Sequence, residues 1–278
     1  MLKKWIALSA VIAMMAPAIA CGKKPGSGSE EKPATEAASQ PEASSAPAAA
    51  TVGKGTIKGV VRYEGDAPNM PQLKRSGDFC DQFPTIQAPD VVVNSNKTLK
   101  NVAVTLEGVQ GVKQEAAVEV DQHQCMYDPR VQVGAANKEV TIVNSDETLH
   151  NVHIYNGSKD LFNRPQRGGS KPIKKEFESG IIKFKCDIHP WMTGWLVVTD
   201  SGIGAVTDDQ GSFEIKDVPA GEYTLNFFQE YHGVKPVKVK VEADKTVETE
   251  VVYNASDRAS FEYREVIISH ADHMGHQD

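Results

Sequence analysis

Three side chains that bind soft metals lie within one stretch of the chain, residues 186–192. Cys186 offers a thiolate, His189 an imidazole and Met192 a thioether. Iron-sulfur and structural zinc sites use several cysteines, whereas one cysteine, two histidines and a weak axial methionine form a copper site that transfers single electrons. The stretch therefore indicates a copper site, and it contains only one of the two histidines that such a site needs.

Two upstream residues, His150 and His153, are candidates for the missing imidazole. Side chains of a strand alternate between its two faces. His150 shares a face with the apolar Val152 and Ile154, which puts it on the core side. His153 falls on the opposite face, so we expect His150 to be the ligand.

The same test applies to the run that leads into Cys186. Ile182 and Phe184 share its face, and this apolar face should point into the core. Lys183 and Lys185 alternate with them and are expected in solvent. The thiolate and the imidazole should therefore both point inside the fold.

At these residues the sequence resembles the copper site of the cupredoxins. The short ligand loop most resembles amicyanin, and the His-Asn-Val element is shared with plastocyanin and pseudoazurin. The resemblance covers roughly residues 125–200 and rests on Asn144-x-Asp146, His150-Asn151-Val152 and Cys186-x-x-His189-Pro190-x-Met192-x-Gly194. It implies one type-1 (blue) copper held by His150, Cys186, His189 and Met192. The competing interpretation is a site that has lost its metal, with the histidines, methionine and cysteine serving as packing residues.

The N-terminus has the features of a secretory signal. Two lysines precede an apolar run over residues 5–16, which is too short to span a bilayer, and small residues lead to Cys21. This arrangement resembles a bacterial lipoprotein box, which implies a signal peptide over residues 1–20, lipid on Cys21 and a place in the bacterial cell envelope, on the periplasmic or outer-membrane face. An ordinary signal peptide followed by a chance cysteine is the alternative.

Residues 21–54 are dominated by Ala, Ser, Pro, Glu, Gly and Lys and cannot bury enough apolar surface to offset their ordering entropy. We expect a disordered tether.

The formal net charge of the chain is −7, which makes nucleic acid an unfavourable partner.

The remainder of the chain predicts an all-β fold. Short β-branched or aromatic segments are separated by Gly, Asn, Asp and Pro clusters, and no long window shows a helical apolar period. The expected strands are residues 56–63, 102–106, 140–143, 152–155, 181–186, 195–199, 213–215, 223–228, 237–241 and 247–252. We expect a Greek-key cupredoxin-like sandwich over residues 55–200.

A second module is expected after it. The Asp-Asp-Gln-Gly and Pro-Ala-Gly turns near residues 208 and 219 resemble the carboxypeptidase regulatory-like domain, a small transthyretin-like β-sandwich, here given the bounds 201–253. That family normally opens with a strand like residues 55–62, which lie far upstream. An alternative therefore inserts the cupredoxin into a sandwich whose strands come from both ends, with residues 102–106 as its second strand. Contacts between residues 56–63 and 213–228 would support this arrangement.

The assignments above account for two of the four cysteines. With Cys21 assigned to lipid and Cys186 to copper, Cys80 and Cys125 remain in an oxidising compartment, where a structural disulfide is expected. A redox role is less favoured because the chain has no Cys-x-x-Cys motif.

Two classes of function follow. The first is a one-electron carrier whose redox partner docks near an exposed edge of His189, on an apolar rim of Ile188, Trp191 and Trp195. The second is a lipoprotein that holds copper for delivery, or a metal-free scaffold. Nothing in the sequence favours an enzyme. Histidines in the polar tail, residues 254–278, offer a weaker metal-binding hypothesis.

Overall fold

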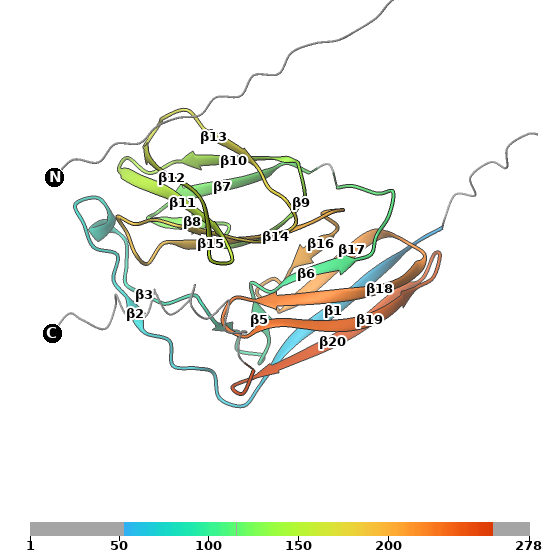
Figure 1. The fold of residues 1–278 in the computed structure, drawn as a ribbon. Helices are drawn as coiled ribbons and strands as arrows, with labels where there is room; N and C mark the ends of the chain where they lie inside the picture. Colours follow the sequence, from blue (N-terminus) through green and yellow to red (C-terminus); the bar gives the residue numbers. More distant parts are fainter. Residues whose placement is uncertain (1–52, 115, 258–278) are drawn as a thin grey trace, which may run out of the picture. The chain divides into compact units, whose positions relative to one another are not determined.

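Two β-sandwiches are visible in the computed structural model, which describes residues 53–114 and 116–257 (Figure 1). The first sandwich packs a four-stranded sheet on a five-stranded one. In spatial order the smaller sheet has β13 (Ile173–Glu176), β10 (Glu139–Asn144), β7 (Val118–His123) and β8 (Met126–Asp128), and the larger has β12 (Lys159–Arg167), β11 (Leu149–Asn156), β14 (Gly180–Lys185), β15 (Thr193–Thr199) and β9 (Val131–Ala135).

The second sandwich packs a three-stranded sheet on a four-stranded one. Its smaller sheet has the order β17 (Ser212–Pro219), β1 (Lys54–Glu64) and β20 (Thr246–Asn254). Its larger sheet has β16 (Gly204–Val206), β6 (Ala103–Glu107), β18 (Gly221–Gln229) and β19 (Gly233–Val241). The expected all-β fold class is confirmed. Among the described residues, no helix is long and apolar enough to cross a membrane.

The second sandwich takes its strands from both sides of the first in sequence. Strand β1 pairs with β17 and β20, and β6 pairs with β16 and β18. The pairing of Ile57 with Ile215 is one of the contacts expected of the inserted arrangement. The contiguous division at residues 200 and 201 is therefore corrected: strands β7 to β15 are inserted between β6 and β16.

One segment leaves the second sandwich and packs on the first. Residues 70–88, here called the cap segment, contain only β2 (Gln72–Leu73), a short 3₁₀ helix η1 (Cys80–Gln82) and β3 (Ile86–Gln87). Its buried Leu73, Cys80 and Ala88 belong to the core of the first sandwich. The expected disulfide joins Cys80 to Cys125 and confirms that pairing. A further short hairpin consists of β4 (Val92–Val93) and β5 (Leu99–Lys100).

Strand β14 carries the site and is covered on both faces. Ile182 and Phe184 are fully buried in the core of the first sandwich, where each contributes about 2 to 3 kcal/mol. The prediction that Lys183 reaches solvent is wrong, because the residue is 2% exposed and its Nζ lies 5.2 Å from the centre of the Trp195 ring. Alternation identified the two faces correctly, but the second face packs beside residues of the other sandwich instead of water.

A buried ion pair joins the two sandwiches, which lie in one compact unit of the chain. Arg130, just before β9, donates Nε and Nη2 to the two carboxylate oxygens of Glu230, at 2.6 and 2.8 Å. Glu230 follows β18, and it also accepts the indole N–H of Trp195 at 2.8 Å. Burial raises the pKa of Glu230, and the adjacent Arg130 opposes that shift. Such a pair is costly to break from one side because the other charge would stay buried.

Candidate metal centre

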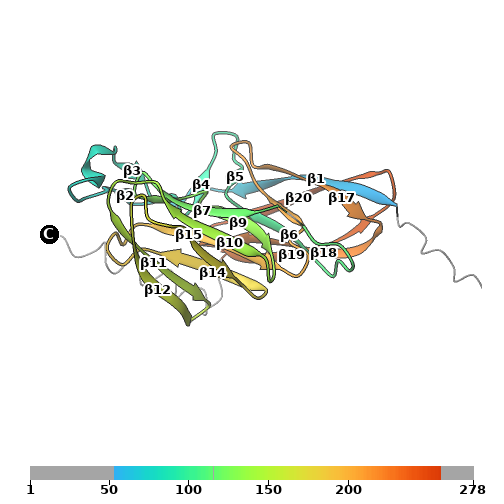
Figure 2. The same ribbon diagram turned by 90° about the horizontal axis from the view of Figure 1, so that it is seen from above.

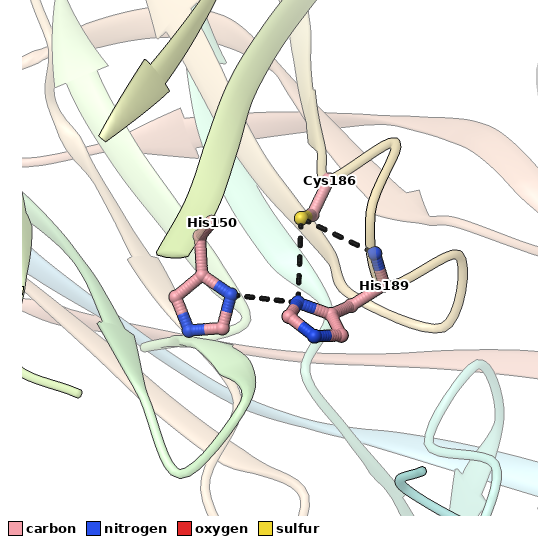
Figure 3. A group of neighbouring side chains, drawn as sticks. All are labelled: His150, Cys186 and His189. Atoms are coloured by element: carbon pink, nitrogen blue, oxygen red, sulfur yellow. Dashed lines mark hydrogen bonds between the residues drawn. The ribbon is translucent and has the colours of Figure 1, made fainter. Parts of the chain in front are cut away.

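Three side chains that can bind a metal lie next to one another (Figure 3). His150 lies near the start of β11, Cys186 directly follows β14, and His189 lies in the loop before β15. The two Nδ1 atoms are 2.8 Å apart, and Cys186 Sγ is 3.7 Å from His189 Nδ1. One ligand atom from each of the three residues lies within 4.8 Å of the others, and all three residues are buried.

This spacing suits one metal ion. Bonds of about 2.0 to 2.3 Å to nitrogen and sulfur hold such donors no more than about 4.5 Å apart. The Nδ1 pair and the sulfur–Nδ1 pair, at 2.8 and 3.7 Å, fall inside that limit. Two imidazoles with one thiolate match the donor chemistry of a trigonal copper site. The residues present therefore fit the metal that the sequence indicated.

Met192 is fully buried in the same core as Cys186. Its N–H donates to the carbonyl of His189, and its own carbonyl accepts from the N–H of Cys186. These bonds close the loop into a compact turn that brings the methionine back to the cysteine.

Asp146 fixes the orientation of His150. Its Oδ2 lies 2.8 Å from His150 Nε2, while its carboxylate also accepts the backbone N–H groups of Gln124 and Cys125. Burial would lower the pKa of His150, but hydrogen bonds with Asp146 and Cys186 raise it instead. A carboxylate on the far nitrogen is the usual way to hold a ligating histidine in one tautomer. Asp146 belongs to the Asn144-x-Asp146 motif, but its bond to His150 could not be predicted from the sequence.

The thiol is prepared to ionise. Backbone N–H groups of Asn151 and His189 each donate to Cys186 Sγ at 3.4 Å. Burial by itself would raise the pKa of this thiol, yet hydrogen bonds from the two histidines and these two N–H groups bring it to about 6. The protein therefore stabilises the thiolate, which is the form that binds metal.

His153 lies away from the three donors, as alternation predicted, and it organises the loop from outside. Its Nδ1 is 2.9 Å from the carboxylate of Asp187, and its Nε2 is 2.9 Å from Asp160. Asp187 also accepts from the side chain of Asn151. This network of polar side chains around Asp187 was missed by the sequence analysis, because its members are joined only by the pairing of β11 with β12 and β14.

The expected docking rim requires correction. Ile188 is 47% exposed, but Trp191 is 8% exposed and donates its indole N–H to the carbonyl of Cys125, and Trp195 is 3% exposed. His189 is also buried, with 7% of its surface exposed, so it does not offer the open edge that was expected. Its Nε2 lies 3.7 Å from Cys80 Sγ, so the cap segment covers the imidazole where an open face was expected.

One part of the chain matches a known protein family. Residues 195–268 match the family described as the CarboxypepD_reg-like domain, a non-catalytic module, in agreement with the expected second module. The match extends beyond the predicted end at residue 253. No curated relative matches the sequence.

Similar solved structures include copper proteins. A purple cupredoxin from Nitrosopumilus maritimus is 25% identical, with 30% of this chain and 99% of that chain covered and a TM-score of 0.27. An amicyanin mutant in the Cu(I) form is 21% identical, covering 34% and 98%, with a TM-score of 0.28. The copper-containing nitrite reductase of Thermus scotoductus is 21% identical, covering 34% and 25%, with a TM-score of 0.27.

Proposed function

We propose that the protein binds one copper ion in a type-1 site and acts as a one-electron carrier. The observation that carries this proposal is the buried convergence of His150 Nδ1, His189 Nδ1 and Cys186 Sγ. Met192 would complete the ligand set as the weak axial donor. Bound copper would supply a centre that alternates between Cu(I) and Cu(II).

The chain's own residues support that role in three ways. Asp146 holds His150 with Nδ1 directed at the site. The N–H groups of Asn151 and His189 stabilise negative charge on the sulfur. The cap segment, linked by Cys80, lies against His189 and keeps water from its imidazole. A ligand set that is held in place and shielded from water favours electron transfer over catalysis.

A visible spectrum of the copper-loaded protein tests the proposal. A copper-thiolate bond gives intense colour that nitrogen and oxygen ligands do not. The oxidised protein should be blue or green and should bleach with one equivalent of reductant. Cys186→Ser should abolish the colour, whereas His123→Ala, which alters an exposed histidine of the same sandwich, should leave it unchanged. Met192→Gln should retain the metal and shift the potential.

Two results would overturn the proposed role as an electron carrier. Copper bound without colour or redox cycling would favour the alternative role in copper storage or delivery. A protein that binds no copper after reconstitution would leave the sandwich as a scaffold.

We further propose that lipid on Cys21 anchors the protein in the bacterial envelope. Cys21, the signal, residues 21–52 of the expected tether and residues 258–278 of the expected tail lie outside the described residues, so the support is the N-terminal sequence alone. Cys21→Ala should move the protein from the membrane to the soluble fraction, and unchanged partitioning would refute the anchor.

A further inference from the structure

Strand β12 is an exposed edge strand beside the candidate metal centre. It pairs with β11 at the end of the five-stranded sheet, and the two form a hairpin at the edge of the fold (Figure 2). Only Gln166 of its nine residues is buried. Edge strands this long and accessible are usually protected against unwanted pairing by charge. Here the charge is strongly of one sign.

Positive charge is concentrated on this hairpin and the following strand. Residues 159–176, from the start of β12 to the end of β13, contain six basic and two acidic residues, in a chain whose formal net charge is −7. We call these six the basic hairpin surface: Lys159, Arg164, Arg167, Lys171, Lys174 and Lys175. Lys174 pairs with Glu139. Within residues 53–114 and 116–257, no carboxylate forms an ion pair with four other cations of this surface, which are Arg164, Arg167, Lys171 and Lys175.

One aromatic ring gathers two of these cations. Lys175 Nζ lies 3.8 Å and Arg164 Cζ 5.6 Å from the centre of the Phe162 ring. Lys175 belongs to β13 and Phe162 to β12, so the ring links the edges of the two sheets. Two unpaired cations held near one another favour an anionic partner.

A short hydrogen-bonded route connects the hairpin to the thiolate. The N–H of Asn151 donates to Cys186 Sγ at 3.4 Å, and the side chain of Asn151 donates to Asn163 Oδ1 at 2.6 Å. Asn163 is an exposed residue of β12, between Phe162 and Arg164. Two hydrogen bonds and the covalent bonds of Asn151 thus connect the sulfur to Asn163, the chain neighbour of Arg164 in the basic hairpin surface. The imidazole of His189, by contrast, is covered by the cap segment.

We propose that the basic hairpin surface docks an electron-exchanging metalloprotein through a carboxylate-rich face, and that Asn151 and Asn163 form the electron route to it. This inference rests on the proposed function. One electron leaves the reduced centre and reduces the oxidised partner by one equivalent. An anionic lipid surface would also attract these cations, but it would have no use for the route to Cys186, so the geometry favours the protein partner.

The binding part can be tested on metal-free protein. Paramagnetic hexacyanochromate(III), a trivalent anion, should broaden amide resonances of residues 159–175 in a heteronuclear NMR titration. Arg164→Glu/Lys175→Glu should lose this broadening. Lys238→Glu/Lys240→Glu, which makes the same charge change at exposed positions of β19, should retain it. Broadening centred elsewhere in the wild type would overturn the assignment of the surface.

The electron route is tested on the copper-loaded protein with small oxidants of opposite charge. At low ionic strength Arg164→Glu/Lys175→Glu should slow oxidation by ferricyanide by about tenfold and speed oxidation by tris(phenanthroline)cobalt(III), while the β19 control changes neither. Asn163→Ala should slow both oxidants without altering the visible spectrum. Equal rates in all variants of a coloured protein would refute the route.

The outcomes separate this inference from the proposed function. A colourless wild type would sink the copper carrier, while the NMR titration would still decide whether the surface binds anions. Sedimentation with phosphatidylglycerol and phosphatidylcholine vesicles distinguishes the other source of negative charge. Charge-dependent binding to the anionic vesicles, with ferricyanide rates unaffected by charge reversal, would overturn the docking of a protein.

Discussion

The disulfide between Cys80 and Cys125 should hold the cap segment over the site as well as stabilise the fold. Both sulfurs are buried, and Cys80 Sγ contacts His189 Nε2 at 3.7 Å. The cap segment has only two-residue strands and a three-residue helix of its own. The cross-link is therefore its strongest attachment to the first sandwich, and Cys80→Ser/Cys125→Ser is the informative perturbation.

The size of the effect follows from the length of the closed loop. The bond joins residues separated by 45 positions, for which the loss of unfolded-chain entropy corresponds to about 4 kcal/mol at 25 °C. Urea unfolding of metal-free wild type and double variant, followed by tryptophan fluorescence, should show a loss of this order. Cys186→Ser is the matched control, because it places the same hydroxyl in a buried site without removing a cross-link, and its loss should be much smaller.

A second readout reports on the cap segment itself. If the bond holds the cap segment in place, the double variant should expose His189 to diethylpyrocarbonate, and its copper-loaded form should bind azide with a change in the visible spectrum. A loss of stability below about 1 kcal/mol would refute the stabilising role of the disulfide. A loss of about 4 kcal/mol with His189 still protected would refute its role in holding the cap segment over the site.

Three further outcomes are expected. In metal-free protein the Cys186 thiolate, followed by its ultraviolet absorption, should titrate with a midpoint of about 6, and a midpoint above 8 would contradict the hydrogen bonds assigned to it. Burial lowers the pKa of Lys183 to about 7, so unfolding takes up a proton above that pH. Between pH 7 and 9 the stability of the wild type should therefore rise more steeply than that of Lys183→Met, by up to about 1.4 kcal/mol per pH unit, while the ionised Cys186 thiol adds an upward slope to both proteins. Arg130→Met should lower the free energy of unfolding by about 3 to 5 kcal/mol by leaving Glu230 buried without its partner, and adding Glu230→Met should restore part of that loss.

Residue types and strand alternation predicted which candidate metal ligands lie together. Cys186, His189 and Met192 are close in sequence, so one short loop brings them together in almost any β fold in which both ends of that loop are buried. His150 was distinguished from His153 by the apolar neighbours on its face, and its imidazole does reach the thiol and His189. Elimination among four cysteines was enough to pair Cys80 with Cys125.

Only the tertiary structure decided what covers each face. A period of two residues separates the faces of a strand but does not show whether the second face meets water or another sheet. Lys183 was expected in solvent for this reason, and Trp195 was expected on an apolar docking rim, yet both are buried beside Glu230 of the second sandwich. Likewise, the cap over His189 comes from a segment about a hundred residues upstream, whose position depends on a long-range disulfide. The pairing of β1 with β17 and β20 across the inserted sandwich is also non-local, and no local pattern in either strand specifies its partner.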